Sequence, residues 1–129
     1  MFQQDQEIFN ILLETVSEGV IIADSHQRIM ETNTSAETIF GYTKKEFLDK
    51  ELNYLTPSNY HTSHSLYLKK LIQIGKRRKL GKALDIFALK KNGTIFPIEV
   101  ELNPFTIHNK TYVMVVFKDV SEKKRLKKT

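Results

Sequence analysis

The stretch KNGTIFPIEVEL, residues 91–102, decides the fold of this 129-residue chain. It contains Asn92-Gly93, the dipeptide most typical of a two-residue β-hairpin turn. After the turn, apolar residues alternate with proline or polar residues, so a strand here has one apolar face and one solvated face. The apolar positions are Phe96, Ile98, Val100 and Leu102. We therefore predict that two strands, Lys82–Lys90 and Thr94–Phe105, flank the turn.

Three further segments have strand patterns. The apolar run Val20–Ala23 and the alternating segment Arg28–Thr32 lie on either side of a polar turn and predict a second hairpin. Thr111–Lys118 follows another turn, residues 107–110, and is apolar through most of its length. The chain is therefore expected to form five strands.

Helical patterns occupy other segments. Asp5–Ser17 has apolar residues at helical spacing. Two short helices, Thr34–Phe40 and Lys44–Leu48, are predicted from capping boxes, in which a hydroxyl residue is followed three positions later by glutamate. A longer helix, Ser58–Ile74, starts after a proline and ends before a glycine. This order predicts an α+β fold, with one five-stranded antiparallel sheet and helices on one face.

Composition limits the classes of function. The chain is 40% hydrophobic and 27% charged, as is typical of soluble globular proteins. It has no cysteine, which excludes disulfides, zinc–thiolate sites and thiol catalysis. No apolar run approaches the roughly 18 residues that a membrane span requires, and the first ten residues lack the features of a signal peptide. We expect a cytoplasmic protein without membrane contact.

Charge is distributed unevenly along the chain. Residues 1–60 carry ten acidic and four basic residues, whereas residues 61–129 carry five acidic and sixteen basic ones. The basic residues concentrate at 69–91 and 118–128. Such clusters can contact nucleic acid, so a basic nucleic-acid-binding module is an alternative function. The clusters lack interleaved aromatic residues for base stacking, which favours a solvated surface instead.

Four segments, in order, resemble hallmark stretches of the PAS domain family of sensory modules. They are Glu18–Asp24 with Arg28, Ile29 and Asn33; Ala36–Phe47; Lys91–Val100; and Val116–Glu122. The resemblance covers Leu12–Lys124 and implies a PAS-like sheet that encloses a pocket for a ligand or cofactor. It also implies a sensory or regulatory role in signal transduction, as in two-component systems, with an effector such as a histidine kinase as partner.

The same resemblance divides the chain into three parts. Residues 1–17 are expected to form an N-terminal helix and a candidate dimerisation element, because its apolar stripe is wider than one side of a small sheet can cover. Residues 18–120 are the expected PAS core. Residues 121–129 are the expected start of a C-terminal signalling helix or linker. We predict a homodimer.

Pocket-lining residues are predicted from the apolar positions of these elements. They are Ile22, Phe40, Phe47, Tyr67, Leu84, Phe87, Ile98, Val113 and Val115. A filled hydrophobic core without a ligand is the alternative interpretation of the same pattern.

His64 is the candidate cofactor ligand. The segment Leu55–Tyr67 is similar to the helix that supplies the proximal histidine in haem-binding oxygen-sensor PAS domains, so haem is a possible cofactor with His64 as axial ligand. The chain departs from that pattern at or near Leu84, where those sensors carry a ligand-stabilising arginine. Flavin photochemistry requires a reactive cysteine, which disfavours flavin here.

Nothing in the sequence predicts catalysis. The chain has neither a phosphate-binding glycine loop nor a metal motif such as HExxH. Glu99 and Glu101 share the solvated face of a strand, where carboxylates suit solubility more than acid–base catalysis. We expect no enzyme activity, no catalytic residue and no metal site.

Overall fold

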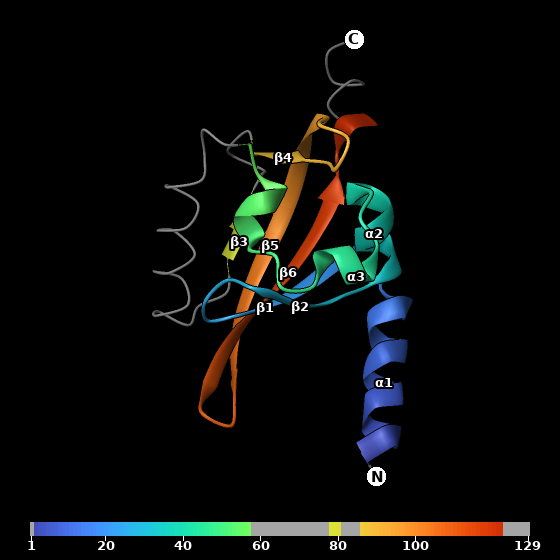
Figure 1. Ribbon diagram of the computed structural model, residues 1–129, viewed down its shortest axis with the longest axis vertical. Coiled ribbons are helices and arrows are strands. Elements are labelled where there is room, and N and C mark those ends of the chain that lie inside the picture. Colours follow the sequence, from blue (N-terminus) through green and yellow to red (C-terminus); the bar gives the residue numbers. More distant parts are fainter. Residues whose placement is uncertain (1, 58–77, 81–85, 123–129) are drawn as a thin grey trace.

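An antiparallel sheet forms the centre of the structure (Figure 1). The computed structural model describes residues 2–57, 78–80 and 86–122. The strands are β1 (Gly19–Asp24), β2 (Ile29–Thr32), β3 (Arg78–Leu80), β4 (Phe87–Leu89), β5 (Ile95–Ile107) and β6 (Lys110–Asp119). They are ordered β2-β1-β6-β5-β3, and β4 also pairs with β5. This arrangement confirms the predicted α+β fold with its antiparallel sheet.

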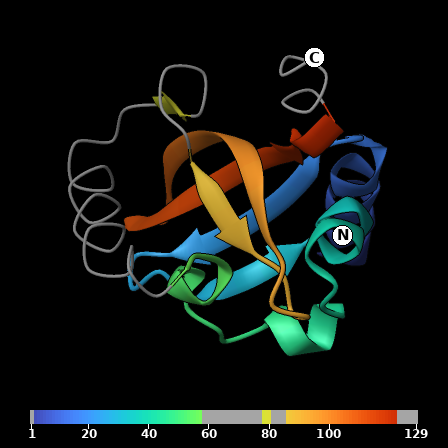
Figure 2. The same cartoon turned by 90° about the horizontal axis from the view of Figure 1, so that it is seen from above.

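The long strand β5 gives the sheet its curvature. One side of β5 pairs with β6 from Ile98 to Ile107. Its other side pairs with β4 through residues 95–97 and with β3 through residues 100–102. Figure 2 shows β5 bending between these two partners. The sequence did not predict β3, because this three-residue strand has no alternating apolar pattern.

Short helical segments cover one face of the sheet (Figure 1). They are α2 (Thr34–Phe40), α3 (Lys44–Phe47) and the 3₁₀ turn η1 (Leu52–Leu55). The first two were predicted within one residue of their observed bounds, whereas η1 was not predicted. The N-terminal helix α1 (Phe2–Thr15) extends away from the sheet. The predicted helix Ser58–Ile74 lies outside the described residues.

Helix caps fix where α2 and α3 begin. Thr43 and Glu46 form the predicted capping box of α3. At α2 the predicted box was wrong, because the capping residue is Asn33, one position earlier. Its backbone is extended, and its side-chain oxygen accepts a hydrogen bond from Ala36 N at 3.0 Å. Gly41 ends α2 in a left-handed conformation, at a φ of 83° that suits glycine.

The alternation of the strands separates two apolar clusters. The inner cluster faces α2, α3 and η1 and includes the predicted core positions Phe96, Ile98 and Leu102, with Val100 packed against it. The outer cluster lies on the opposite face of the sheet. It contains Leu13, Val20 and Ile22, with Phe105, Tyr112, Met114 and Val116 packed against them. The inner cluster positions the candidate site.

Candidate functional site

A cavity of about 100 Å³ lies between the inner face of the sheet and the segments α2 and η1. Strands β1, β4, β5 and β6 form most of its described wall. The described residues that line it are Ile21, Phe40, Leu52, Leu55, Thr56, Ile86, Phe87, Ala88, Ile98, Val100, Leu102, Val115 and Phe117. All of these except Thr56 have hydrocarbon side chains.

The hydroxyl of Thr56 forms a hydrogen bond to the neighbouring turn η1. Its Oγ1 donates a hydrogen bond to the carbonyl of Asn53 at 2.9 Å, and its backbone N–H donates to the same carbonyl at 3.1 Å. The hydroxyl proton is therefore directed at η1. This proton is therefore not directed into the cavity.

Three phenylalanine rings make one part of the inner cluster rigid. The Phe40 ring lies 5.2 Å from the Phe117 ring and 5.5 Å from the Phe96 ring, in edge-to-face arrangements. Phe40 is the last residue of α2, and its carbonyl accepts a hydrogen bond from Lys91 N at 2.9 Å. The turn before β5 thus holds the end of α2 against the cavity.

The predicted pocket residues divide between the two faces of the sheet. Phe40, Phe87, Ile98 and Val115 line the cavity. Phe47 and Val113 are fully buried in the same inner cluster but are not among the lining residues.

Ile22 belongs to the outer cluster, away from the cavity. Its neighbour Ile21 faces inward, opposite Val115 in the ladder between β1 and β6. Because successive side chains of a strand point to opposite faces, assigning Ile22 to the pocket placed β1 one residue out of phase. The run Val20–Ala23 is apolar on both faces, so its pattern carries no signal for the phase.

Several predicted features lie outside the described residues. These are His64, Tyr67, Leu84 and most of the two basic clusters. Sequence reasoning also missed Leu52 and Leu55, which reach the cavity from η1. Their spacing of three residues suits a 3₁₀ turn, and this spacing was the available signal.

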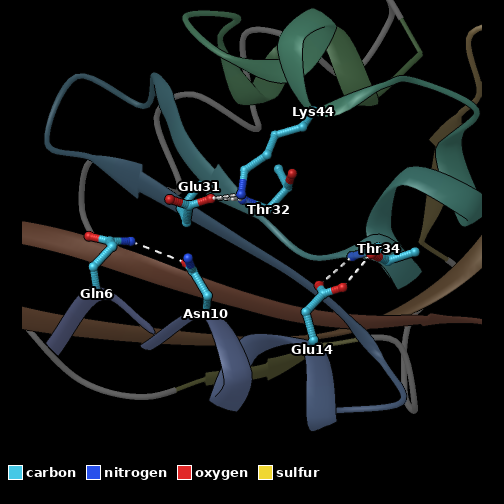
Figure 3. Close-up of polar contacts among 7 residues, drawn as sticks. All are labelled: Gln6, Asn10, Glu14, Glu31, Thr32, Thr34 and Lys44. Carbon is cyan, nitrogen blue, oxygen red and sulfur yellow. Dashed lines mark hydrogen bonds and ion pairs between the residues drawn. The ribbon is translucent and has the colours of Figure 1, made fainter. Parts of the chain in front are cut away.

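Polar contacts join α1 to the start of α2 (Figure 3). The Glu14 carboxylate of α1 accepts hydrogen bonds from the hydroxyl of Thr34 and, at 2.8 Å, from its backbone N–H. These bonds lower the pKa of Glu14. Beside them Asn33, which is 1% exposed, donates from Nδ2 to the carbonyls of Leu13 and Glu18 at 2.9 and 3.0 Å. The base of α1 is therefore tied to α2.

Charged groups elsewhere lie at the surface. Lys44 pairs with Glu31 (Figure 3), and Lys91 pairs with Glu46. The bond from Lys91, with the backbone N–H of Thr43, lowers the pKa of Glu46 to about 2.

Within the described parts of the chain, no histidine, aspartate and glutamate side chains gather in a group suited to a metal ion. No helix among these residues combines the length and hydropathy needed to cross a bilayer.

Comparison with known proteins identifies the fold family. A family profile for the PAS domain matches residues 17–122. The chain belongs to the PAS domain family. A solved PAS domain from Colwellia psychrerythraea superimposes with a TM-score of 0.78 at 18% identity, covering 91% of this chain and 98% of that one. A PAS domain from a two-component sensor histidine kinase gives a TM-score of 0.74 at 12% identity, with 92% and 99% covered.

Longer sensor proteins contain segments similar to this chain. Sensor histidine kinase TmoS of Ectopseudomonas mendocina is 28% identical over 90% of this chain and 12% of its own length. Oxygen sensor protein DosP of Escherichia coli is 25% identical over 88% of this chain and 14% of its own length. Sensor protein FixL of Bradyrhizobium diazoefficiens is 22% identical over 86% of this chain and 22% of its own length. The chain spans between 8% and 22% of the curated relatives it matches.

Proposed function

We propose that this PAS domain is the input module of a signal-transduction protein and that its cavity receives the signal as a small molecule. The observation that carries the proposal is the position of two residues of the cavity wall on the last strand of the sheet. Val115 and Phe117 of the wall belong to β6, the strand that leads into residues 120–129. A ligand that contacts these side chains therefore contacts the strand that directly precedes residue 120.

The output follows from a shift between two conformations. A ligand that binds one arrangement of β6 more tightly than another moves the population towards it. An effector, such as the histidine kinase domain of a longer protein, then responds to the segment after β6. The similarity to oxygen sensor protein DosP and sensor histidine kinase TmoS supports this role. We propose that the PAS domain itself catalyses no reaction, because no described lining residue carries an ionisable side chain.

The test compares loaded and stripped protein. Native mass spectrometry of the purified chain identifies any bound small molecule, and hydrogen exchange then follows the amides of β6 with and without it. We expect slower exchange in β6 when the ligand is present. Unchanged exchange throughout β6 and residues 120–122 in a ligand-saturated protein would contradict an input role.

A haem-based form of this proposal depends on His64. The described wall has no histidine for the iron and no arginine or lysine for the propionates. The described part of the cavity therefore does not favour haem. An absorption spectrum of protein purified from haem-supplemented cells tests the idea, because His64→Ala should abolish any Soret band. A colourless protein that takes up no added hemin would exclude it.

We further propose that the PAS domain is a homodimer through α1. The helix has exposed apolar side chains that the described part of the chain does not cover, namely Ile8, Phe9, Ile11 and Leu12, and Val16 just after the helix is exposed as well. The outer face of the sheet offers a second apolar surface, with Phe105 stacked on Tyr112 at 5.5 Å between ring centres. A second copy of the chain provides an apolar surface for both α1 and the outer face of the sheet to pack against.

A further inference from the structure

We infer that the signal received by the cavity is a small, uncharged, largely apolar molecule about the size of a single benzene ring. The inference rests on the proposed input function and adds the chemical class of the ligand. It is carried by three properties of the described wall: its chemistry, its size and its rigidity.

The chemistry of the wall excludes strong polar recognition along the sheet. The inward positions of β1, β5 and β6 that reach the cavity are Ile21, Ile98, Val100, Leu102, Val115 and Phe117. None of these side chains can donate or accept a hydrogen bond. A carboxylate or ammonium group placed against them loses its hydration without a compensating partner, which costs several kcal/mol or more. An apolar ligand gains free energy from the same contact.

The only polar side chain in the described wall strengthens this conclusion. Thr56 already donates its hydroxyl proton to the carbonyl of Asn53. Redirecting that proton to a ligand would break a bond within η1, so the site offers no ready donor from this residue. A neutral hydrocarbon ligand does not need a hydrogen-bond donor.

The volume of the cavity indicates the scale of the ligand. Its volume is about 100 Å³, whereas pockets for drug-sized ligands occupy roughly 300–1,000 Å³. An engineered apolar cavity of about 150 Å³ in another protein stays dry and binds benzene. A single ring or a short branched hydrocarbon matches this scale.

The wall is also held in shape before any ligand arrives. Phe40 is fixed by the Phe96 and Phe117 rings and by the backbone bond from Lys91. A preformed apolar wall reduces the entropic cost of binding. The edge-to-face packing of these rings suits a further aromatic ring.

The experiment titrates benzene, phenol, benzoate and hemin separately into the 129-residue chain while methyl NMR spectra are recorded. Ile21 and Ile98 report on the cavity, whereas Ile22 reports on the opposite face as an internal control. We expect benzene to shift the first two methyl groups saturably, with benzoate at least about tenfold weaker. If benzoate or hemin binds these positions more tightly than benzene, the inferred class is wrong although the input function stands.

Adjacent residues of β6 provide a matched pair of variants. Val115 lines the cavity and Val116 packs on the outer face. Val115→Phe should fill the cavity and weaken benzene binding at least about tenfold, whereas Val116→Phe should leave it unchanged. Equal effects, or none from Val115→Phe, would overturn the site. If Val115→Phe does not fold, Val115→Ala should shift the preference towards p-xylene, and an unchanged preference would overturn the inference.

A third outcome separates this inference from the proposed function. If benzene, phenol, benzoate and hemin all leave the cavity methyl groups unshifted and native mass spectrometry finds no bound molecule, both the ligand class and the input role fail. Binding of a charged molecule alone removes only the ligand class.

Discussion

At the scale of single residues, the contact between Gly19 and Phe117 sets a strict size limit in the core. The two residues face each other in the ladder between β1 and β6. A Cβ atom added to Gly19 would lie 2.4 Å from two ring atoms of Phe117, closer than such atoms approach in proteins. Phe117 is 1% exposed and packs against Phe40, so its ring has little room to move.

We predict that Gly19→Ala destabilises the PAS domain. Overpacking of this kind typically costs about 1–3 kcal/mol in the free energy of unfolding, which urea denaturation measures. Phe117→Leu shortens the opposing side chain, so adding it to Gly19→Ala should cost less than the sum of the two single changes. Additive effects, or a Gly19→Ala protein as stable as the wild type, would show that the ring yields easily.

At the scale of elements, one buried amide joins α1, β1 and α2. The Asn33 side-chain oxygen accepts from Val20 N at 2.9 Å and from Ala36 N at 3.0 Å. Its Nδ2 donates to carbonyls at the end of α1 and before β1. Because Asn33 is 1% exposed, water cannot readily replace these partners.

Asn33→Ala should therefore lower the free energy of unfolding by about 3 kcal/mol, since it leaves several buried backbone groups without partners. It should also speed hydrogen exchange near Leu13, at the base of α1. The control is Asn10→Ala, which removes an exposed amide whose oxygen accepts a hydrogen bond from Gln6 at 3.1 Å (Figure 3); a change within about 0.5 kcal/mol is expected. Similar losses from both variants would show that the buried hydrogen bonds of Asn33 are not the cause of the destabilisation.

The link between α3 and the turn before β5 should respond to pH. Bonds from Lys91 and Thr43 lower the pKa of Glu46 to about 2 from its ordinary value of 4.5. The folded protein therefore favours the ionised carboxylate. Its stabilising contribution is fully present above about pH 5 and is lost as the pH falls towards 2.

The measurement is the midpoint of urea unfolding as a function of pH for the wild type and Glu46→Gln. We expect the two curves to converge as the pH falls below 4.5, and the difference at neutral pH to shrink with added salt. Glu37→Gln, on the neighbouring helix, controls for the general loss of a carboxylate. A difference between wild type and Glu46→Gln that persists at pH 2 would contradict the assignment.

The sequence predicted elements better than it predicted contacts between them. The Asn-Gly turn, the alternation from Phe96 to Leu102 and the Thr43 capping box depend on neighbouring residues, and the structure confirms all three. Asn33 was placed correctly at a junction, but its partners at Leu13 and Val20 lie up to 20 residues away. The phase of β1 depends on its pairing with β6, nearly a hundred residues later.

At the scale of the whole molecule, α1 is attached at its base and exposed along its length. Among residues 6–15 of α1, whose side chains the structure describes, only Leu13 belongs to the buried clusters, and the polar contacts of Glu14 and Asn33 lie beside it. Figure 1 shows the rest of the helix extending away from the sheet. Ile11 and Leu12 remain 61% and 60% exposed. Such an apolar helix is stable in water chiefly when another surface covers it.

Ile11→Lys should therefore convert the proposed dimer to a monomer, because a charge in an apolar interface loses its hydration without a partner. The neighbouring Asn10→Lys places the same charge on an exposed polar position and should leave the dimer intact. Light scattering after size exclusion, at tens of micromolar (about 10–50 μM, above the dissociation constants of most specific complexes), gives both masses directly. A wild-type chain that is monomeric under these conditions would remove the dimer proposal. It would leave the cavity and its ligand untouched, because all described lining residues come from one chain.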